Sequence, residues 1–249
     1  MLSSRPSSSV RLSAVGVALA FGIVAASPRV ARADIDPASG IDLVTITHPG
    51  NAPWPGGDGP MANNAGRGSV AYEYRIGRYE VTTAQWAEFM TAAYNRPQSD
   101  WIPHLAPPTF WGASATSVGA VPGGKRYVYS PQNAMRPVGN ISWRMAAIYC
   151  NWLTNNKSLD RAAFLSSAYD VSTFGYEGNI FTDQLTRSAG ARYFIPTLDE
   201  WIKAAHYDPN RYGENQEGWW HYSHTSDTFA IPGAPGTITP GGPAQANYG

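Results

Sequence analysis

Apolar side chains recur at helical spacing in three segments of the chain, and each segment starts at a residue that favours a helix N-terminus. The first helix is predicted to start at Thr82, where Gln85 completes a capping box. The second is predicted to start at Ser142, and the third at Thr197, where Glu200 completes another capping box. The side chains predicted to face the core are Trp86, Phe89, Met90 and Ala93 in the first helix, Ala146, Tyr149, Cys150 and Leu153 in the second, and Trp201, Ala204 and Ala205 in the third.

Short runs that alternate apolar and polar residues predict strands around these helices. The candidate strands are residues 41–47, 71–81 with a bulge at Gly77, 125–130 and 193–195. Residues 155–190 are predicted to be a polar, weakly periodic insertion, and most of the remaining sequence is typical of loops. No internal repeat and no domain linker is evident. We therefore expect one α+β domain, loop-rich with short strands and about three helices.

Composition narrows the class of protein further. Charged residues make up 14% of the chain and aromatic residues 12%, and the chain holds 25 Gly and 20 Pro. A long helical bundle needs a sequence rich in Ala, Glu, Lys and Leu, and a disordered chain has fewer aromatic residues. The composition therefore argues against both classes. Because 18 Lys and Arg balance 18 Asp and Glu, the chain has no excess positive charge for nucleic acid. We therefore expect a globular domain held by aromatic packing, with no nucleic-acid partner.

The N-terminus, residues 1–33, is typical of a secretory signal peptide. Arg5 and Arg11 precede a charge-free, mostly apolar run over residues 12–26, which is short for a membrane span. Ala31-Arg32-Ala33 fits the small-x-small cleavage rule, which places the mature start near Asp34. An uncleaved membrane anchor is the alternative. No later apolar run is long enough to span a membrane, so we expect an exported protein, periplasmic, on the cell surface or secreted.

The chain has a single cysteine, Cys150, which cannot form a disulfide within the chain. On the predicted helix it shares the buried side with Ala146 and Leu153. This position predicts an inert core thiol rather than a reactive one. His221 and His224, three residues apart, raise a zinc hypothesis. Their setting does not look helical and no clustered carboxylate accompanies them, which favours loop histidines.

Three segments carry motifs that belong together. The first runs from Tyr74 to Phe89 through Glu80-Val81-Thr82, and the second from Arg136 to Leu153 through Ile141-Ser142-Trp143 and Tyr149-Cys150-Asn151-Trp152. The third is Ile195-Pro196-Thr197-Leu198-Asp199-Glu200-Trp201. In order and spacing these segments resemble the sulfatase-modifying-factor domain of the formylglycine-generating enzymes. The resemblance spans about residues 41–249, and residues 204–209 and 222–228 resemble a bacterial exported subgroup.

The resemblance implies a C-type-lectin-like fold with many loops. It also implies a chemistry, because the formylglycine-generating enzymes oxidise a substrate cysteine with O₂ at copper(I) held by two cysteines of their C-terminal segment. The position of Cys150 is structural in that family. The family segments G-x-x-D-M-x-G-N-V-W-E-W and R-x-x-R-G-G-S-W do not occur here. We therefore expect a domain over residues 34–249 that lacks the family's C-terminal part. No catalytic or cofactor-binding residue is predicted, and copper is expected only if a cysteine pair lies downstream.

A partial calcium site is a second implication of the resemblance. In the family, an Asn in an A-N-[IYF] segment supplies a side-chain oxygen and the next residue a carbonyl oxygen. The matching residues here are Asn247 and Tyr248. Calcium takes six to eight oxygen ligands, and the family's other ligands are missing. We therefore expect this half-site to bind calcium weakly at most.

The expected function is that of an exported, non-catalytic binding or structural module with an unidentified protein or glycan ligand. The alternative is a fragment of a copper-dependent formylglycine-generating oxidoreductase that acts on a sulfatase cysteine. An iron-dependent sulfoxide synthase is a third class, but it needs an N-terminal helical domain that is absent here. Aromatic residues in the predicted loops either form a recognition surface or fill the core, and we expect them to fill the core. They are Trp101, Phe110, Trp111, Trp219 and Trp220.

Overall fold

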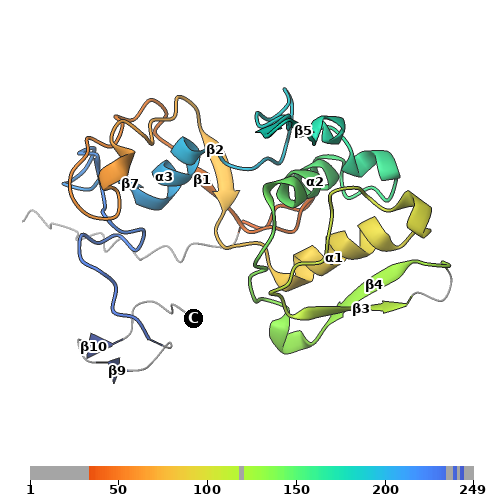
Figure 1. Ribbon diagram of the computed structural model, residues 1–249. Coiled ribbons are helices and arrows are strands. Elements are labelled where there is room, and N and C mark those ends of the chain that lie inside the picture. The colour runs from red at the N-terminus through yellow and green to blue at the C-terminus, as the bar shows by residue number, and fades with distance from the viewer. Residues whose placement is uncertain (1–33, 118–120, 234–237, 240–241, 244–249) are drawn as a thin grey trace, which may run out of the picture. The chain divides into compact units, whose positions relative to one another are not determined.

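The computed structural model describes residues 34–117, 121–233, 238–239 and 242–243 (Figure 1). Residues 33–249 make up one unit of the chain, and the other unit, residues 1–32, lies outside the described residues.

Three α-helices lie in these described ranges, and each begins at the N-cap that the sequence predicts. They are α1 (Thr83–Tyr94), α2 (Trp143–Thr154) and α3 (Leu198–His206). The capping boxes of α1 and α3 are complete, because the Thr hydroxyl accepts from the third helical N–H and the Gln or Glu side chain accepts from the Thr N–H. The Ser142 hydroxyl caps α2 by accepting from the Met145 N–H. Local capping chemistry therefore locates all three helix starts.

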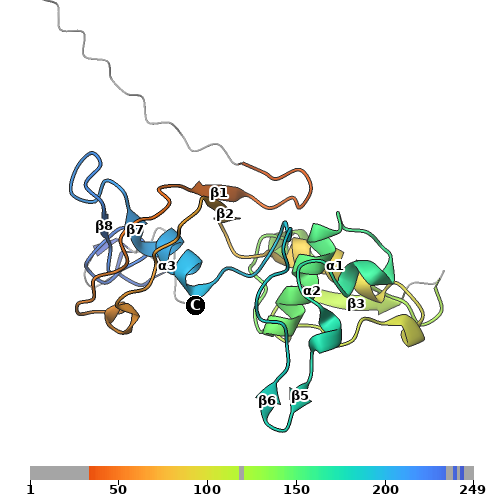
Figure 2. The same cartoon turned by 90° about the horizontal axis from the view of Figure 1, so that it is seen from above.

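The strands form short antiparallel pairs. They are β1 (Leu43–Ile46) with β2 (Tyr74–Gly77), β3 (Ala113–Ser117) with β4 (Lys125–Tyr129), β5 (Tyr176–Glu177) with β6 (Ile180–Phe181), β7 (Tyr207–Asp208) with β8 (Gly218–Trp219), and β9 (Ile238–Thr239) with β10 (Gly242–Pro243). Turns of 3-10 helix lie at Ala62–Asn64, Gln98–Asp100, Pro131–Asn133, Arg161–Phe164 and Val171–Thr173. This is the loop-rich α+β architecture with short strands that the sequence predicts. Figure 2 shows the β5–β6 hairpin projecting from the neighbourhood of α2.

The main core is an aromatic cluster between α1 and α2. Phe89 is fully buried, and its ring centroid lies 5.0 Å from Trp86, 5.1 Å from Tyr149 and 5.5 Å from Trp152. Phe164, from the turn after α2, closes the cluster at 6.0 Å. Edge-to-face and tilted rings at these distances add about 0.5–1.5 kcal/mol per pair to the gain from burial. The predicted core face of α1 is confirmed, and in α2 Tyr149, Cys150 and Leu153 are buried as predicted, whereas Ala146 is only half-buried.

One buried amide holds the segment that follows α2 against this core. The Asn151 side chain is fully buried. Its Nδ2 donates to the carbonyls of Phe164 (3.1 Å) and Tyr169 (2.8 Å). Its Oδ1 accepts from the N–H groups of Ala168 (2.8 Å) and Tyr169 (2.7 Å). Residues 155–190, predicted to be a polar insertion, therefore supply core side chains, which are Ala163, Phe164, Ala168, Tyr169, Val171 and Phe174.

A second, smaller apolar cluster lies beside α3. It contains Trp54, Met61, Ile202 and Trp219, with Trp54 and Trp219 in edge contact at 6.3 Å. Lys203 is also buried here, and its ammonium donates to the His48 carbonyl at 2.8 Å.

The predicted core face of the third helix is wrong. Trp201 is 51% exposed, and Ala204 and Ala205 are only half-buried. The buried residues of α3 are Glu200, Ile202, Lys203 and His206. Charged residues can occupy a buried face where other segments supply partners, and apolar periodicity alone does not reveal those partners.

Two strand predictions also need correction. The bulge expected at Gly77 is absent, because β2 ends there and the chain bends at the next two residues. A Cβ at Gly77 would lie 2.9 Å from the Tyr79 carbonyl oxygen, so this bend requires glycine. Residues 193–195 are in no strand pair of the described chain. The predicted strands at 41–47 and 125–130 are confirmed as β1 and β4.

The loop aromatic residues mostly fill the interior, as expected. Trp101 and Trp111 pack against the main core, and Trp219 is buried in the second cluster. Trp220 is half-buried, with the Arg211 guanidinium 3.5 Å from its ring centroid. Phe110 is the exception at 74% exposed. Among the described helices, none is long and apolar enough to cross a membrane.

Candidate binding cavity

Among the described residues, the two histidines considered for zinc do not share a site. Asn247 and Tyr248 lie outside the described residues. The His221 ring lies 5.6 Å from the Trp54 ring and the His224 ring 5.6 Å from the Tyr222 ring, so each packs against an aromatic side chain. Within the described ranges, no group of three or more His, Cys, Asp or Glu side chains could hold a metal ion.

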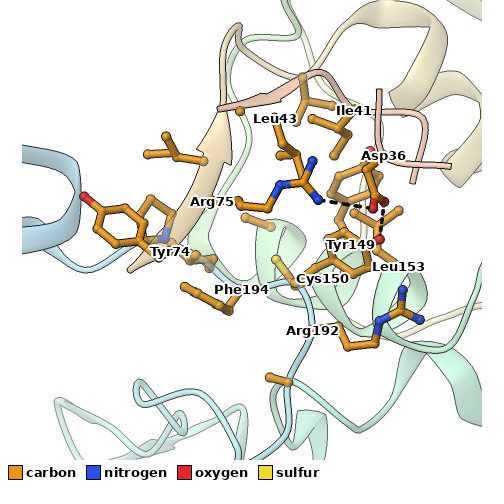
Figure 3. Close-up of a pocket in the computed structure, with 18 of the residues that line it drawn as sticks. Asp36, Ile41, Leu43, Tyr74, Arg75, Tyr149, Cys150, Leu153, Arg192 and Phe194 are labelled. Carbon is orange, nitrogen blue, oxygen red and sulfur yellow. Dashed lines mark hydrogen bonds and ion pairs between the residues drawn. The ribbon is translucent and has the colours of Figure 1, made fainter. Parts of the chain in front are cut away.

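The burial predicted for Cys150 is confirmed. The side chain is 8% exposed, and burial raises the pKa of the thiol to about 12. At neutral pH it is therefore protonated, which makes it a poor nucleophile. The helix periodicity did not show that Cys150 lies at the floor of a cavity, with its sulfur turned toward the open space (Figure 3).

This cavity has a volume of about 940 Å³ and an apolar floor. The floor comes from α1 and α2 and from the segment before α2. It consists of Trp86, Ile141, Ala146, Tyr149, Cys150 and Leu153. Two exposed aromatic side chains, Tyr79 at 65% and Trp201 at 51%, also line it. Concave apolar sites with a few polar groups are the usual form of ligand pockets.

One wall of the cavity is the β1–β2 pair, to which Ile41 and Leu43 also contribute, and the outer edge of β2 is unpaired among the described strands. Every residue from Tyr72 to Val81 lines the cavity, and β2 within this stretch pairs with β1 alone among the described strands. The Arg78 N–H donates to the Asp42 carbonyl at 2.8 Å, and bonded and non-bonded pairs alternate along an antiparallel ladder. The backbone N–H and C=O groups of Arg75 and Gly77 therefore point away from β1.

The opposite wall is the segment Ala191–Pro196, which bends at Arg192 and Tyr193. Its alternate residues are held by the main core, since the Tyr193 N–H donates to Thr154 Oγ1 (3.2 Å) and the Ile195 N–H to Tyr169 Oη (3.0 Å). The backbone groups of Arg192 and Phe194 have no hydrogen-bond partner within the described residues. The second wall thus also presents polar backbone groups two residues apart.

Buried ion pairs fix both walls in place. Glu200 is fully buried and accepts hydrogen bonds from Arg187 (2.8 Å), the Tyr72 hydroxyl (2.8 Å) and the Thr197 N–H (2.7 Å). Burial would raise the pKa of Glu200, but these hydrogen bonds outweigh it and hold the pKa below its usual value. The Arg187 guanidinium also lies 3.7 Å from the Phe194 ring centroid. One carboxylate thereby joins α3, the segment leading into β2, and the opposite wall.

A second carboxylate, that of Asp36, lines the cavity itself. Asp36 accepts hydrogen bonds from Tyr193 and from the Ser39 hydroxyl, the latter at 2.7 Å, and lies 3.7 Å from Arg75 (Figure 3). Burial would raise the pKa of Asp36, but these groups together lower it to about 2. Asp36 is therefore ionised across the physiological range and holds Arg75 and Tyr193 in fixed positions.

Sequence reasoning missed both cavity walls. The alternation over residues 71–81 predicts a strand there, but not which edge stays unpaired. The arginines that line the cavity occupy polar positions of the sequence, and nothing in the sequence pattern distinguishes a paired guanidinium from a solvated one.

Comparison with known proteins agrees with this fold. No curated protein and no solved structure matches the chain. The model of one protein family, described as the sulfatase-modifying factor enzyme 1-like domain, matches residues 47–236. This range contains α1, α2, α3 and both walls of the cavity, and the α+β arrangement is the C-type-lectin-like architecture of that domain. The chain belongs to the sulfatase-modifying factor enzyme 1-like family.

Proposed function

We propose that this chain is an exported formylglycine-generating-enzyme-like module that binds a ligand without catalysing a reaction. The observation that supports this is the cavity of about 940 Å³, whose apolar floor carries the chain's only thiol in a protonated state. A cavity of this size can take a ligand. Nothing in its floor is an activated nucleophile.

Copper(I) does not fit the residues of this chain. The copper site implied by the family needs two thiolates, since copper(I) prefers soft sulfur ligands. The chain has one cysteine, and burial keeps its thiol protonated at neutral pH. A single protonated thiol cannot supply that ligand set. The alternative function, a copper-dependent oxidoreductase acting on a sulfatase cysteine, therefore lacks its metal site in the residues present.

Two measurements on the purified chain test the proposal. Oxygen uptake with copper(I) and a cysteine-containing peptide should equal that of copper and peptide alone. The dye 1-anilinonaphthalene-8-sulfonate should bind with increased fluorescence, and Ala146→Trp, which fills the floor of the cavity, should weaken that binding. Oxygen uptake above the background, with an aldehyde formed on the peptide, would establish the oxidoreductase instead. Dye binding that Ala146→Trp leaves unchanged would place the ligand elsewhere.

Export is tested separately. The N-terminal residues are typical of a cleaved signal, so the protein recovered outside the cytoplasm should begin near Asp34. N-terminal sequencing of that protein reads the start directly. A chain that keeps residues 1–33 and sediments with membranes would establish the anchor alternative.

A further inference from the structure

The cavity offers backbone groups as well as apolar surface, and this narrows the class of ligand. Arg75 and Gly77 turn their N–H and C=O groups away from β1, on a stretch whose every residue lines the cavity. Arg192 and Phe194 leave their backbone groups unpaired on the opposite wall. On both walls the free groups recur every second residue. That repeat matches an extended polypeptide strand.

We propose that the cavity binds an extended peptide segment of a partner protein, which adds a strand to the free edge of β2. This inference rests on the proposed binding function and names its ligand class. The peptide's backbone pairs with Arg75 and Gly77, and its apolar side chains lie on the floor around Ala146 and Cys150. Main-chain hydrogen bonds supply affinity in such a complex, and the floor selects alternate apolar side chains.

The charges around the cavity add one feature of the peptide. Three of the four arginines that line it already have carboxylate partners: Arg75 contacts Asp34 and Asp36, Arg78 contacts Asp42, and Arg187 contacts Glu200. The fourth, Arg192, is exposed, and its guanidinium donates only to the Asn156 amide oxygen at 2.7 Å within the described residues. An acidic residue at one end of the peptide would pair with Arg192.

The test uses a synthetic peptide with these features. The probe is fluorescein-labelled Asp-Val-Thr-Val-Thr-Val-Asp, in which apolar valines alternate with polar threonines. It carries an acidic residue at each end, so that one of them can pair with Arg192 whichever way the strand runs. Fluorescence anisotropy with the full chain measures its Kd. Two control peptides keep every side chain but are N-methylated, one at the valines and the other at the threonines. Because adjacent residues of a strand point their N–H groups to opposite sides, one of the two cannot pair with β2. That peptide should bind about tenfold more weakly or worse.

Two protein variants test the side-chain contacts. Arg192→Gln should weaken binding of the probe about fivefold, since it removes one exposed ion pair. The matched control is Arg126→Gln on β4, which is exposed and does not line the cavity, and it should leave the Kd unchanged. Ala146→Trp should abolish binding of the probe. Thermal melting of each variant checks that it is folded.

The outcomes separate the two proposals. Probe binding that N-methylation of one residue set weakens, and that Ala146→Trp removes, supports the added strand. If the dye binds in the cavity but the probe does not, or if both N-methylated peptides bind as well as the parent, the peptide proposal is overturned and the binding module stands. If neither binds, both proposals fail. Sedimentation that shows a stable dimer which the probe cannot dissociate would make a second copy the occupant and would also overturn the proposal.

Discussion

The two sides of the molecule are stabilised in different ways. Around α1 and α2, the interior is a dense aromatic cluster in which Phe89, Trp86 and Phe164 are fully buried. Around α3, the apolar cluster contains four residues, and the buried set also includes Glu200, Lys203 and His206. The first region is stabilised by buried apolar surface and close packing of rings, and the second by specific partners of its buried polar groups. Apolar packing tolerates changes of pH, whereas a region that depends on paired charges does not.

This difference also explains where the cavity lies. Its floor belongs to the aromatic region, while its walls are positioned by the carboxylates Asp36 and Glu200. A rigid apolar floor with walls fixed by hydrogen bonds is a preorganised binding site, which loses little entropy when a ligand enters. Mutations in each of the two regions test this difference.

The largest effect is expected from Phe89→Ala in the aromatic core. It removes a fully buried ring with four aromatic neighbours and should lower the free energy of unfolding by about 3–5 kcal/mol. Urea denaturation followed by tryptophan fluorescence measures this. The control is Phe110→Ala, because that ring is 74% exposed, and it should change stability by less than about 0.5 kcal/mol. Similar losses in both variants would contradict the assignment of this core.

A smaller effect is expected from Glu200→Gln in the α3 region. Gln can still accept from the Thr197 N–H and so keeps the capping box, but it leaves Arg187 without its anion. The free energy of unfolding should fall by about 3 kcal/mol, as for other broken buried ion pairs. Glu88→Gln is the control, because that carboxylate is half-exposed and pairs with Lys157 at the surface. Equal stability of the Glu200 and Glu88 variants would refute the structural role of the buried pair.

The smallest effect is pH-dependent and belongs to Asp36. Its pKa of about 2 in the folded protein lies below the ordinary value of 3.8. The stabilisation it provides is therefore complete above about pH 4 and is lost as the pH falls toward 2. The loss should amount to about 2 kcal/mol, and Asp36→Asn should remove this part of the pH dependence.

Urea midpoints measured between pH 5 and pH 2 check the Asp36 prediction. Asp34→Asn is the matched control, because Asp34 also contacts Arg75 but its side chain is 64% exposed. That variant should follow the parent protein closely. An Asp36→Asn variant with the full pH dependence of the parent would show that other carboxylates carry the acid sensitivity.

The sequence predicted the features that depend on neighbouring residues. All three helix starts follow from caps and capping boxes, and the core faces of α1 and α2 follow from apolar spacing. The features it missed depend on contacts between distant segments. Glu200 is buried because Tyr72, 128 residues away, donates to it, and Lys203 because His48, 155 residues away, accepts from it. No local pattern contains this information, which is why apolar spacing predicts Trp201 in the core and does not predict Glu200 there.

The candidate site divides in the same way. The burial of Cys150 follows from helix periodicity, and so does part of the cavity floor. The walls do not follow from periodicity, because whether a strand edge is unpaired depends on where all the other strands lie. The free edge of β2 can be identified only when its other edge is known to pair with β1.

The Asn151 amide also constrains how this chain can vary. It binds only main-chain atoms of residues 164–169, so it places no requirement on the side chains of that stretch. The spacing between the bonded groups, in contrast, must be kept, because one residue added between Phe164 and Ala168 would shift the Phe164 carbonyl relative to the other three bonded groups. Relatives that share this asparagine should therefore exclude insertions and deletions from this stretch, and should vary mainly at its exposed positions such as Ser166, because Phe164, Ala168 and Tyr169 also fill the core.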